Sequence, residues 1–454
     1  MVPDCAPQQV GASRGGHPTM DHPLRAPLAN ELHARPFLRI AGPAAVTHYA
    51  IYADGDATIH DELLGRLCEL TGLPQPDRDA AHYSGRWGPD RQLKWERHTE
   101  FSTFTFVACR RDADYFSELA TEHVPQAWFR ALEGKVFVAI RIELVSGDAA
   151  PRAREDAGLW VDRASMVGSQ VLGGAQVFCD WTIRPDGFLR FLVIDNGLRQ
   201  VQSGRLVQRL YEIETYRMMA LLALPVARDL GRSLEAQLRS LAPLMLSMDG
   251  SRSGPHDAAL LARLTHLAAR TESLADAGSR MSAARAYEGL VHARIHELGE
   301  ARLEGMPTIA EFLERRFGPA MATCRAVWAR HEQVAARVAR AVDLLRTRVS
   351  VAQEEDTTRL LEGIDRSARS QLRLQHAVEG LSIAAISYYV LSLSGAALRS
   401  LHAANFLGSP EAIEGILILP VILSILFIMR RKRRIIGEPH EAEPGRRGGL
   451  AEDK

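Results

Sequence analysis

The stretch QVFCDWTIRPDGFLRFLVID, residues 176–195, carries the clearest local signal in the chain. Two apolar and aromatic runs flank the tetrapeptide Arg184-Pro185-Asp186-Gly187. Proline presets the backbone angle φ at the second position of a turn, and glycine tolerates the positive φ that turns often need. The pattern therefore predicts a β-hairpin and places both runs in a sheet.

Upstream of the hairpin, strand patterns and helix patterns alternate. Strands are predicted where β-branched and aromatic residues gather, and helices where apolar residues recur every three or four positions. The predicted strands are 44–54, 100–110 and 135–145, and the predicted helices are 57–73 and 124–134. Together with the hairpin they predict an α+β domain over residues 21–200, with a sheet of about five strands.

Two details of this domain are also predicted. Lys94, Glu96, His98 and Glu100 alternate along the chain, which could form a polar pocket but is more typical of the solvent-exposed face of a strand. The pair Gly173-Gly174 lies within a strand pattern and indicates a β-bulge.

Residues 201–376 are compatible with helix almost throughout. The break GMPTI, residues 305–309, separates two long helical arms. An apolar seam with the spacing of coiled coils consists of Val327, Val334, Val338, Ala341 and Leu345, with His331 at one of its positions. We expect a long-helix bundle or coiled-coil stalk and a homo-oligomer formed through these arms, which could pair within one chain or between chains.

Two segments are long and apolar enough to cross a bilayer, 380–398 and 412–429. Arg430 to Arg434 are all basic, and such clusters stay on the cytoplasmic side of a membrane. A two-helix transmembrane hairpin over 377–434 is therefore predicted, with both long flanks cytoplasmic. Residues 1–20, which lack a signal-peptide pattern, and the tail 435–454 are predicted to be disordered.

Composition narrows the classes of function. The 55 basic and 55 acidic residues give a formal net charge of zero, so no basic excess points to nucleic acid. The five cysteines form no CxxC pair, which favours a reducing compartment. We find no Gly-rich phosphate loop, GxSxG motif or Cys/His pair at catalytic spacing. No catalytic residue and no cofactor are predicted, and a non-enzymatic protein is favoured.

Two sets of residues are candidates for ion binding. His292 and His296 lie one helical turn apart and could share a metal ion, although the flank of a solvated helix has the same pattern. Ser387, Ser394 and Asn405 could line an ion pathway through the membrane. Small residues at this spacing also let helices pack closely, which is the commoner reason for them.

The sequence resembles a family of uncharacterised membrane-anchored proteins of proteobacteria, a domain of unknown function. The resemblance covers about residues 21–434. It rests on NELHARPF (30–37), WERHTEFSTFTF (95–106), the hairpin 176–195, GRLVQRLYEIETYRMMALLALP (204–225) and AISYYV (385–390). It implies the bacterial inner membrane and carries no activity.

A looser likeness in architecture links the chain to CorA magnesium channels. These channels carry Gly-Met-Asn after their first span, whereas this chain has Ala403-Ala404-Asn405 there. Two hypotheses follow. The chain is a membrane-anchored scaffold or sensor with the lipid bilayer and an unknown protein as partners, or it is an oligomeric cation channel or transporter.

Overall fold

The structure is a computed structural model of the 454-residue chain. It describes residues 22, 24–25, 28–29, 37–53, 55–56, 58–77, 80–110, 115–149, 157, 160–162, 164–248, 255–403, 419–424 and 427. The predictions for residues 1–20, Asn405, most of the span 412–429 and the tail 435–454 lie outside these residues. The chain divides into two compact units: 1–251 with 258–345, and 252–257 with 346–454.

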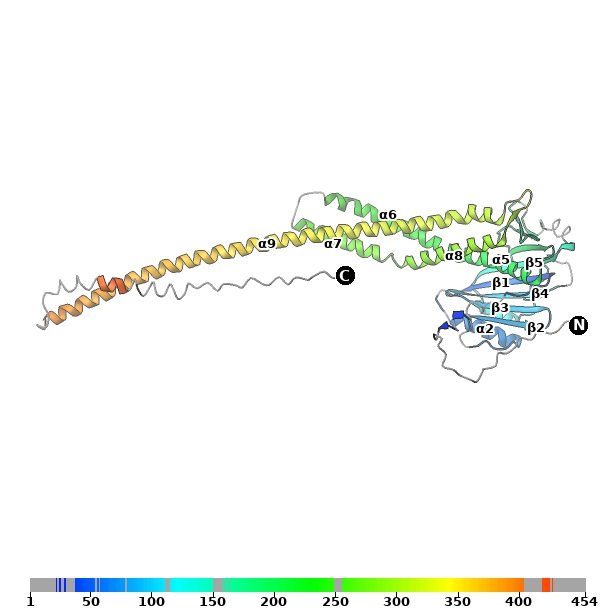
Figure 1. Cartoon of the computed structure of the whole chain (residues 1–454), viewed down its shortest axis with the longest axis horizontal. Coiled ribbons are helices and arrows are strands. Elements are labelled where there is room, and N and C mark those ends of the chain that lie inside the picture. Colours follow the sequence, from blue (N-terminus) through cyan, green and yellow to red (C-terminus); the bar gives the residue numbers. More distant parts are fainter. Residues whose placement is uncertain are drawn as a thin grey trace. The chain divides into compact units, whose positions relative to one another are not determined.

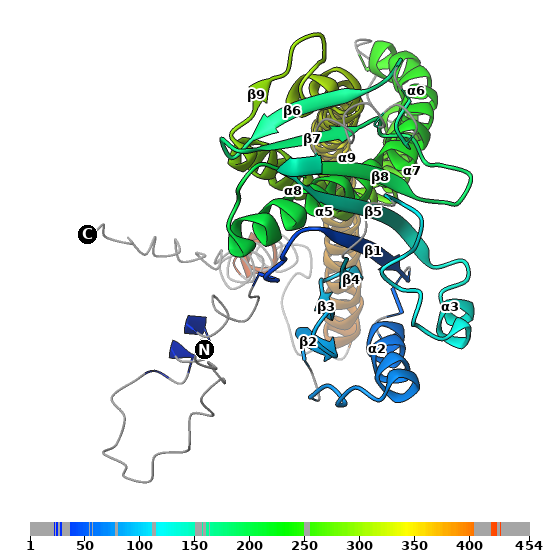
Figure 2. The ribbon, with the colours of Figure 1, turned by 90° about the vertical axis from the view of Figure 1, so that its right-hand side faces the viewer.

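A nine-stranded sheet forms the centre of the first unit, counted over the described residues. Its strands follow the order β2-β3-β4-β1-β5-β8-β7-β6-β9, which can be followed in Figure 2. Neighbours are antiparallel except for the parallel pair β5–β8. The strands are β1 Ala44–Tyr52, β2 His82–Trp87, β3 Arg91–Arg97, β4 Phe101–Cys109, β5 Val136–Ser146, β6 Val167–Val171, β7 Ala175–Cys179, β8 Leu189–Asp195 and β9 Ala301–Arg302.

The predicted hairpin is confirmed as β7 and β8, which pair antiparallel with Val177 opposite Val193. Gly187 has φ +85°, and its N–H donates to the carbonyl of Arg184. The predicted bulge at Gly173-Gly174 is wrong. These glycines belong to the turn between β6 and β7, and Gly173 takes a φ of +71° there.

Helices cover both faces of the sheet. On one face, α2 (Thr58–Thr71) and α3 (Gln126–Ala131) form a core with β3 and β4. On the other, α5 (Gln200–Leu221), α8 (Ala277–Leu298) and the first turns of α9 (Ile309–Ala403) share a core with β1, β5 and β8. We call residues 37–221 and 277–317 the sheet domain. The predicted mixed α+β class is confirmed, with more strands than the sequence indicated.

The predicted seam at 327–345 is buried inside the chain. Val334, Val338, Ala341 and Leu345 of α9 share one core with α6 (Ala223–Ser247) and α7 (Pro255–Glu272), which lie beside α9 in Figures 1 and 2. His331 is buried in this bundle, with Nε2 3.1 Å from the carbonyl of Thr271, while no described group pairs with its Nδ1. This part of the arms therefore pairs within one chain.

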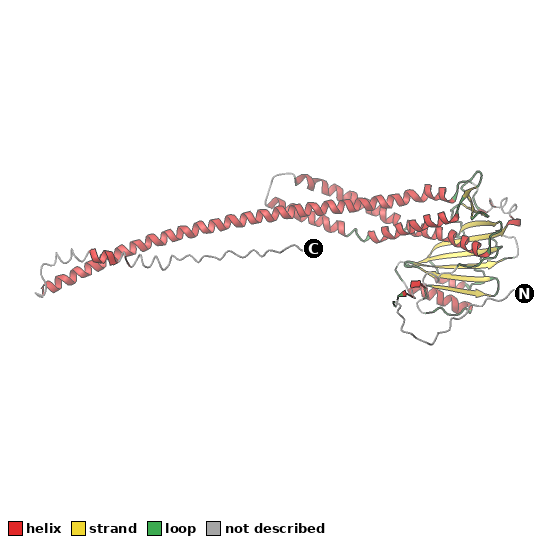
Figure 3. Ribbon diagram, in the orientation of Figure 1, coloured by secondary structure: helices red, strands yellow, loops and turns green. Residues whose placement is uncertain are grey.

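α9 is one helix of 95 residues, drawn as helix from end to end in Figure 3. By length and composition it is the one helix long and apolar enough to cross a membrane in the part of the chain that the structure describes. The apolar stretch belongs to the first predicted span, 380–398. The second span, and with it the two-helix hairpin, is not shown, because only 419–424 and 427 of 412–429 are described.

Candidate functional site

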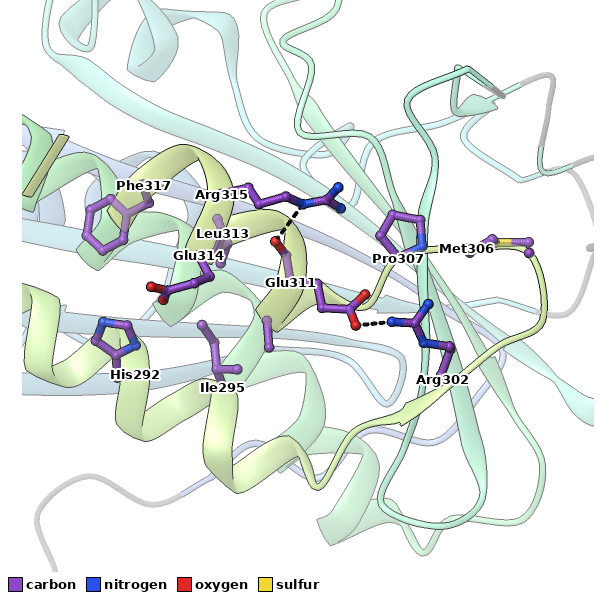
Figure 4. A pocket seen from close by; sticks show the side chains of 12 residues that line it. His292, Ile295, Arg302, Met306, Pro307, Glu311, Leu313, Glu314, Arg315 and Phe317 are labelled. Atoms are coloured by element: carbon purple, nitrogen blue, oxygen red, sulfur yellow. Dashed lines mark hydrogen bonds and ion pairs between the residues drawn. The ribbon is translucent and has the colours of Figure 1, made fainter. Parts of the chain in front are cut away.

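A cavity of about 890 Å³ opens in the sheet domain where α8 ends and α9 begins (Figure 4). This volume lies in the range of sites for small ligands. It is lined by His292, Ile295, Arg302, Gly305, Met306, Pro307, Ala310, Glu311, Leu313, Glu314, Arg315 and Phe317. The lining therefore comes from the last turns of α8, the connecting loop with β9, and the first turns of α9.

The backbone N–H groups at the start of α9 already have hydrogen-bond acceptors. The N–H of Thr308 donates to Glu311 Oε2 (3.1 Å), and the N–H of Glu311 donates to Thr308 Oγ1 (3.2 Å), which forms a capping box. The N–H of Ile309 donates to Ser169 Oγ, and that of Ala310 donates to Glu300 Oε2. Because these N–H groups already have acceptors, the helix start does not offer the cradle that binds phosphate.

The cavity has an apolar floor and a charged rim. Leu313 and Phe317 are buried and Ile295 is partly buried, so they supply an apolar surface. At the rim, Arg302 pairs with Glu311. In Figure 4, His292 of α8 and Glu314 of α9 extend toward the cavity from facing helices. This arrangement suits a ligand with an apolar body and a polar end.

The two predicted metal ligands differ in position. Both His292 and His296 are exposed on α8, and His292 lines the cavity whereas His296 does not. No group of three or more His, Cys, Asp or Glu side chains is placed to hold a metal ion among the residues that the structure describes. Metal binding by the pair stays a prediction.

A second polar cluster lies between the sheet and α5, centred on His48 of β1. His48 is fully buried, hydrogen-bonded through Nδ1 to Thr105 (2.8 Å) and through Nε2 to Thr215 (3.2 Å), and stacked on Tyr211. Burial, with smaller contributions from the charges of His98 and Lys94, lowers the pKa of His48 to about 3. The imidazole is therefore neutral at neutral pH, with both nitrogens engaged, and its role is structural.

Lys94 and Glu96 of β3 are buried, so the prediction that they face solvent is wrong. Lys94 is 2% exposed and Glu96 is 5% exposed, because α5 covers this face of the sheet. Lys94 Nζ lies 3.1 Å from Glu96 Oε1 and donates to Gln208 Oε1 of α5 (3.1 Å). Gln208 in turn donates to Glu212, which pairs with Arg294 of α8. We call these five residues the charge chain.

Residues 98–100 connect β3 to β4, and Glu100 among them contacts helix α8. Glu100 accepts hydrogen bonds from Arg280 (2.8 Å) and from Tyr287 (2.9 Å). His98 stacks on Phe101 with ring centroids 4.2 Å apart. Lys94 thus contacts α5, Glu100 contacts α8 and His98 stacks on β4. These polar side chains serve packing within the sheet domain, and the cavity remains the better candidate for ligand binding.

The candidate pathway residues in α9 are only partly described. Ser387 and Ser394 are half-buried, and the Ser387 hydroxyl donates to the carbonyl of Ile383 (2.8 Å). Asn405 lies outside the described residues. Their role in an ion pathway stays a prediction.

Most of the cavity lining was missed from the sequence, although a signal for it exists. The break GMPTI predicts the boundary between two helical arms but not the cavity beside it. Thr308-Ile-Ala-Glu311 follows the pattern of a capping box, which marks the start of a helix directly after a turn. A sharp turn between two long helices leaves room beside their ends, and the cavity lies there.

The comparisons with known proteins agree with the resemblance seen in the sequence. Residues 20–436 match a family described as "Protein of unknown function (DUF3422)". No curated protein and no solved structure matches the chain. Since the match covers most of its length, the chain belongs to this family of proteins of unknown function.

Proposed function

We propose that this protein is a membrane-anchored sensor or scaffold in the bacterial inner membrane. Its sheet domain binds an amphipathic ligand or protein segment in the cavity, and α9 connects that event to the bilayer. The bilayer is one partner, and a further copy of the chain is another. The sheet domain and the C-terminal tail lie on the cytoplasmic side, in line with the basic cluster 430–434.

The observation that carries this proposal is the continuity of α9. Six residues between 310 and 317 line the cavity, and the predicted span 380–398 lies in the same helix. A single helix therefore carries both the cavity lining and the predicted span. This arrangement favours a sensor or scaffold over a protein whose binding site works independently of its membrane anchor.

The anchor is tested with two exposed serines of α9, Ser370 and Ser400. Each is replaced by cysteine in the full chain, and spheroplasts are treated with a membrane-impermeant maleimide. Ser400→Cys should be labelled from outside, because it follows the predicted span, whereas Ser370→Cys should be labelled only after lysis. Equal labelling of the two variants in intact spheroplasts would contradict the proposed topology.

Ligand binding is tested with the dye 1-anilinonaphthalene-8-sulfonate, which has an apolar body and one sulfonate. We expect its fluorescence to rise with the protein in nanodiscs, above that with empty nanodiscs. Ala310→Trp fills the cavity and should remove most of the rise. Ala322→Trp, at an exposed position of the same helix, is the matched control. If both variants bind dye like the parent chain, the cavity is not the site.

The channel hypothesis draws on the stripe Gly380, Ala384 and Ser387 in the predicted span. Two spans per chain cannot enclose a pore, so this function needs a ring of copies. Ser387→Leu should then reduce cation uptake at unchanged protein level. Unchanged uptake leaves the anchor as the role of the span.

A further inference from the structure

The seam of α9 that is covered by its own chain ends at Leu345. Val338, Ala341 and Leu345 are buried by the bundle, whereas every residue from 353 to 380 is exposed. Several of these exposed side chains are large and apolar, including Leu360 (70% exposed), Ile364 (65%) and Leu374 (68%). Hydrophobic side chains of this size on one helix normally pack against another element.

The charged side chains between 360 and 378 are kept off one side of the helix, although Leu361 and Leu372 are also exposed outside the stripe described next. Six uncharged residues recur at alternating spacings of four and three and form one stripe: Leu360, Ile364, Ser367, Gln371, Leu374 and Val378. At 3.6 residues per turn this stripe spans an arc of roughly 80°. We call it the 360–378 stripe. Its spacing is that of the a and d positions of a coiled coil.

All charged residues of this segment lie on the opposite side. Glu362, Asp365, Arg366, Arg369 and Arg373 fall within an arc of roughly 100° centred about half a turn away from the stripe. They pair along their own helix: Arg366 lies 3.4 Å from Glu362, and Arg369 lies 2.5 Å from Asp365. Four of these five charges are thus paired without a partner helix, and both signs are present, which does not favour an anionic lipid surface.

We infer that the 360–378 stripe pairs in parallel and in register with the same stripe of a second copy of this chain. An uncharged stripe with charges only on the far side is self-complementary, because identical helices meet no like charges across the seam. Ser367 and Gln371 would lie opposite their own copies, and polar residues at such positions fix register in coiled coils.

The parallel orientation rests on the proposed membrane anchor, because two copies inserted in one bilayer with the same topology enter it side by side and in the same direction. Leu381, Ala385 and Tyr388 continue the spacing of the stripe into the predicted span. By the same helical geometry, Gly380 and Ser387 lie on the side away from the second copy, whereas Ala384 flanks the seam. Pairing through the stripe therefore leaves Gly380 and Ser387 for contact with the second span of the same chain.

Cysteine cross-linking tests the pairing in membranes that contain the full chain. Ile364→Cys lies in the stripe, and Arg366→Cys lies on the charged side with similar exposure. Both are made with Cys5→Ser and with Cys109→Ser, because Cys109 is only half-buried, and the parent with these two changes is the blank. Cys68, Cys179 and Cys324 are buried. Under copper phenanthroline, Ile364→Cys should give at least tenfold more disulfide-linked dimer than Arg366→Cys.

Each other outcome overturns the inference. No dimer from Ile364→Cys, or equal dimer from both variants, excludes a specific parallel pair. A cross-link of Ile364→Cys to a protein of different mass assigns the stripe to another partner. The labelling of Ser400→Cys reports the anchor separately, so a failed anchor and a failed pairing are distinguishable.

Discussion

Replacing Lys94 with methionine tests whether the charge chain holds α5 on the sheet. Methionine keeps most of the volume of the side chain but removes the ammonium group. The change abolishes the contact with Glu96 at 3.1 Å and the hydrogen bond to Gln208. Glu96 then stays buried, at 5% exposure, without its cation.

The expected loss of stability follows from the buried carboxylate of Glu96, which is left without its cation. Removing one partner of a buried ion pair typically costs about 3–5 kcal/mol, so we expect Lys94→Met to lower the free energy of unfolding by about 4 kcal/mol. Replacing both partners by apolar residues is often neutral, so Lys94→Met with Glu96→Leu should recover all but about 1 kcal/mol of this loss.

An exposed ion pair supplies the control. Arg232 and Asp229 of α6 form a pair whose side chains are 76% and 69% exposed. Arg232→Met should change the free energy of unfolding by less than about 0.5 kcal/mol. The assay is a urea titration of the purified full chain, read by pulse proteolysis of the sheet domain. A loss below about 1 kcal/mol for Lys94→Met, or a double variant as unstable as the single one, refutes the reasoning.

Four further substitutions test other parts of the fold, each by the same urea titration. Gly204→Ala places a Cβ against the carbonyl oxygen of Leu38 and should lower the free energy of unfolding by about 3 kcal/mol. The added Cβ of Gly289→Ala meets nothing within 4 Å, so this control should stabilise α8 by about 0.5–1 kcal/mol. Equal effects of the two substitutions would exclude the clash at Gly204. His48 is neutral in the folded state, so the free energy of unfolding should fall by about 1.4 kcal/mol for each pH unit below about 6.5, toward its folded-state pKa of about 3. His48→Gln should lack this slope; a variant with the slope of the parent chain would assign it elsewhere. His331→Leu removes the buried Nδ1, which has no hydrogen-bond partner, and should raise the free energy of unfolding by about 1 kcal/mol. A lower free energy of unfolding would show that the hydrogen bond from Nε2 to the carbonyl of Thr271 matters more.

The parts of the fold that could be predicted are those decided by nearby residues. Arg184-Pro185-Asp186-Gly187 specifies a turn by its own chemistry, and Gly187 takes the positive φ of that turn. The seam 327–345 could be predicted for the same reason, because its spacing is local, but its packing against α6 and α7 could not.

The parts that failed depend on contacts between distant segments. Nothing near Lys94 and Glu96 in the sequence indicates that α5, more than 100 residues later, covers them. Strand β9 has only two residues, too few for any alternating pattern, and forms because Ala301 and Arg302 meet β6. The cavity is missed for the same reason, since its lining joins α8, a loop and α9 in space.

The core that α9 shares with the sheet ends well before the predicted span in the order of synthesis. Cys324 of α9 is the last buried residue of the core that contains β1 and α5. About 55 residues separate it from the predicted span, which at about 5–20 residues per second corresponds to roughly 3–11 seconds of translation. The exposed middle of α9 therefore separates, in time of synthesis, the last residues of this core from the apolar stretch 380–398.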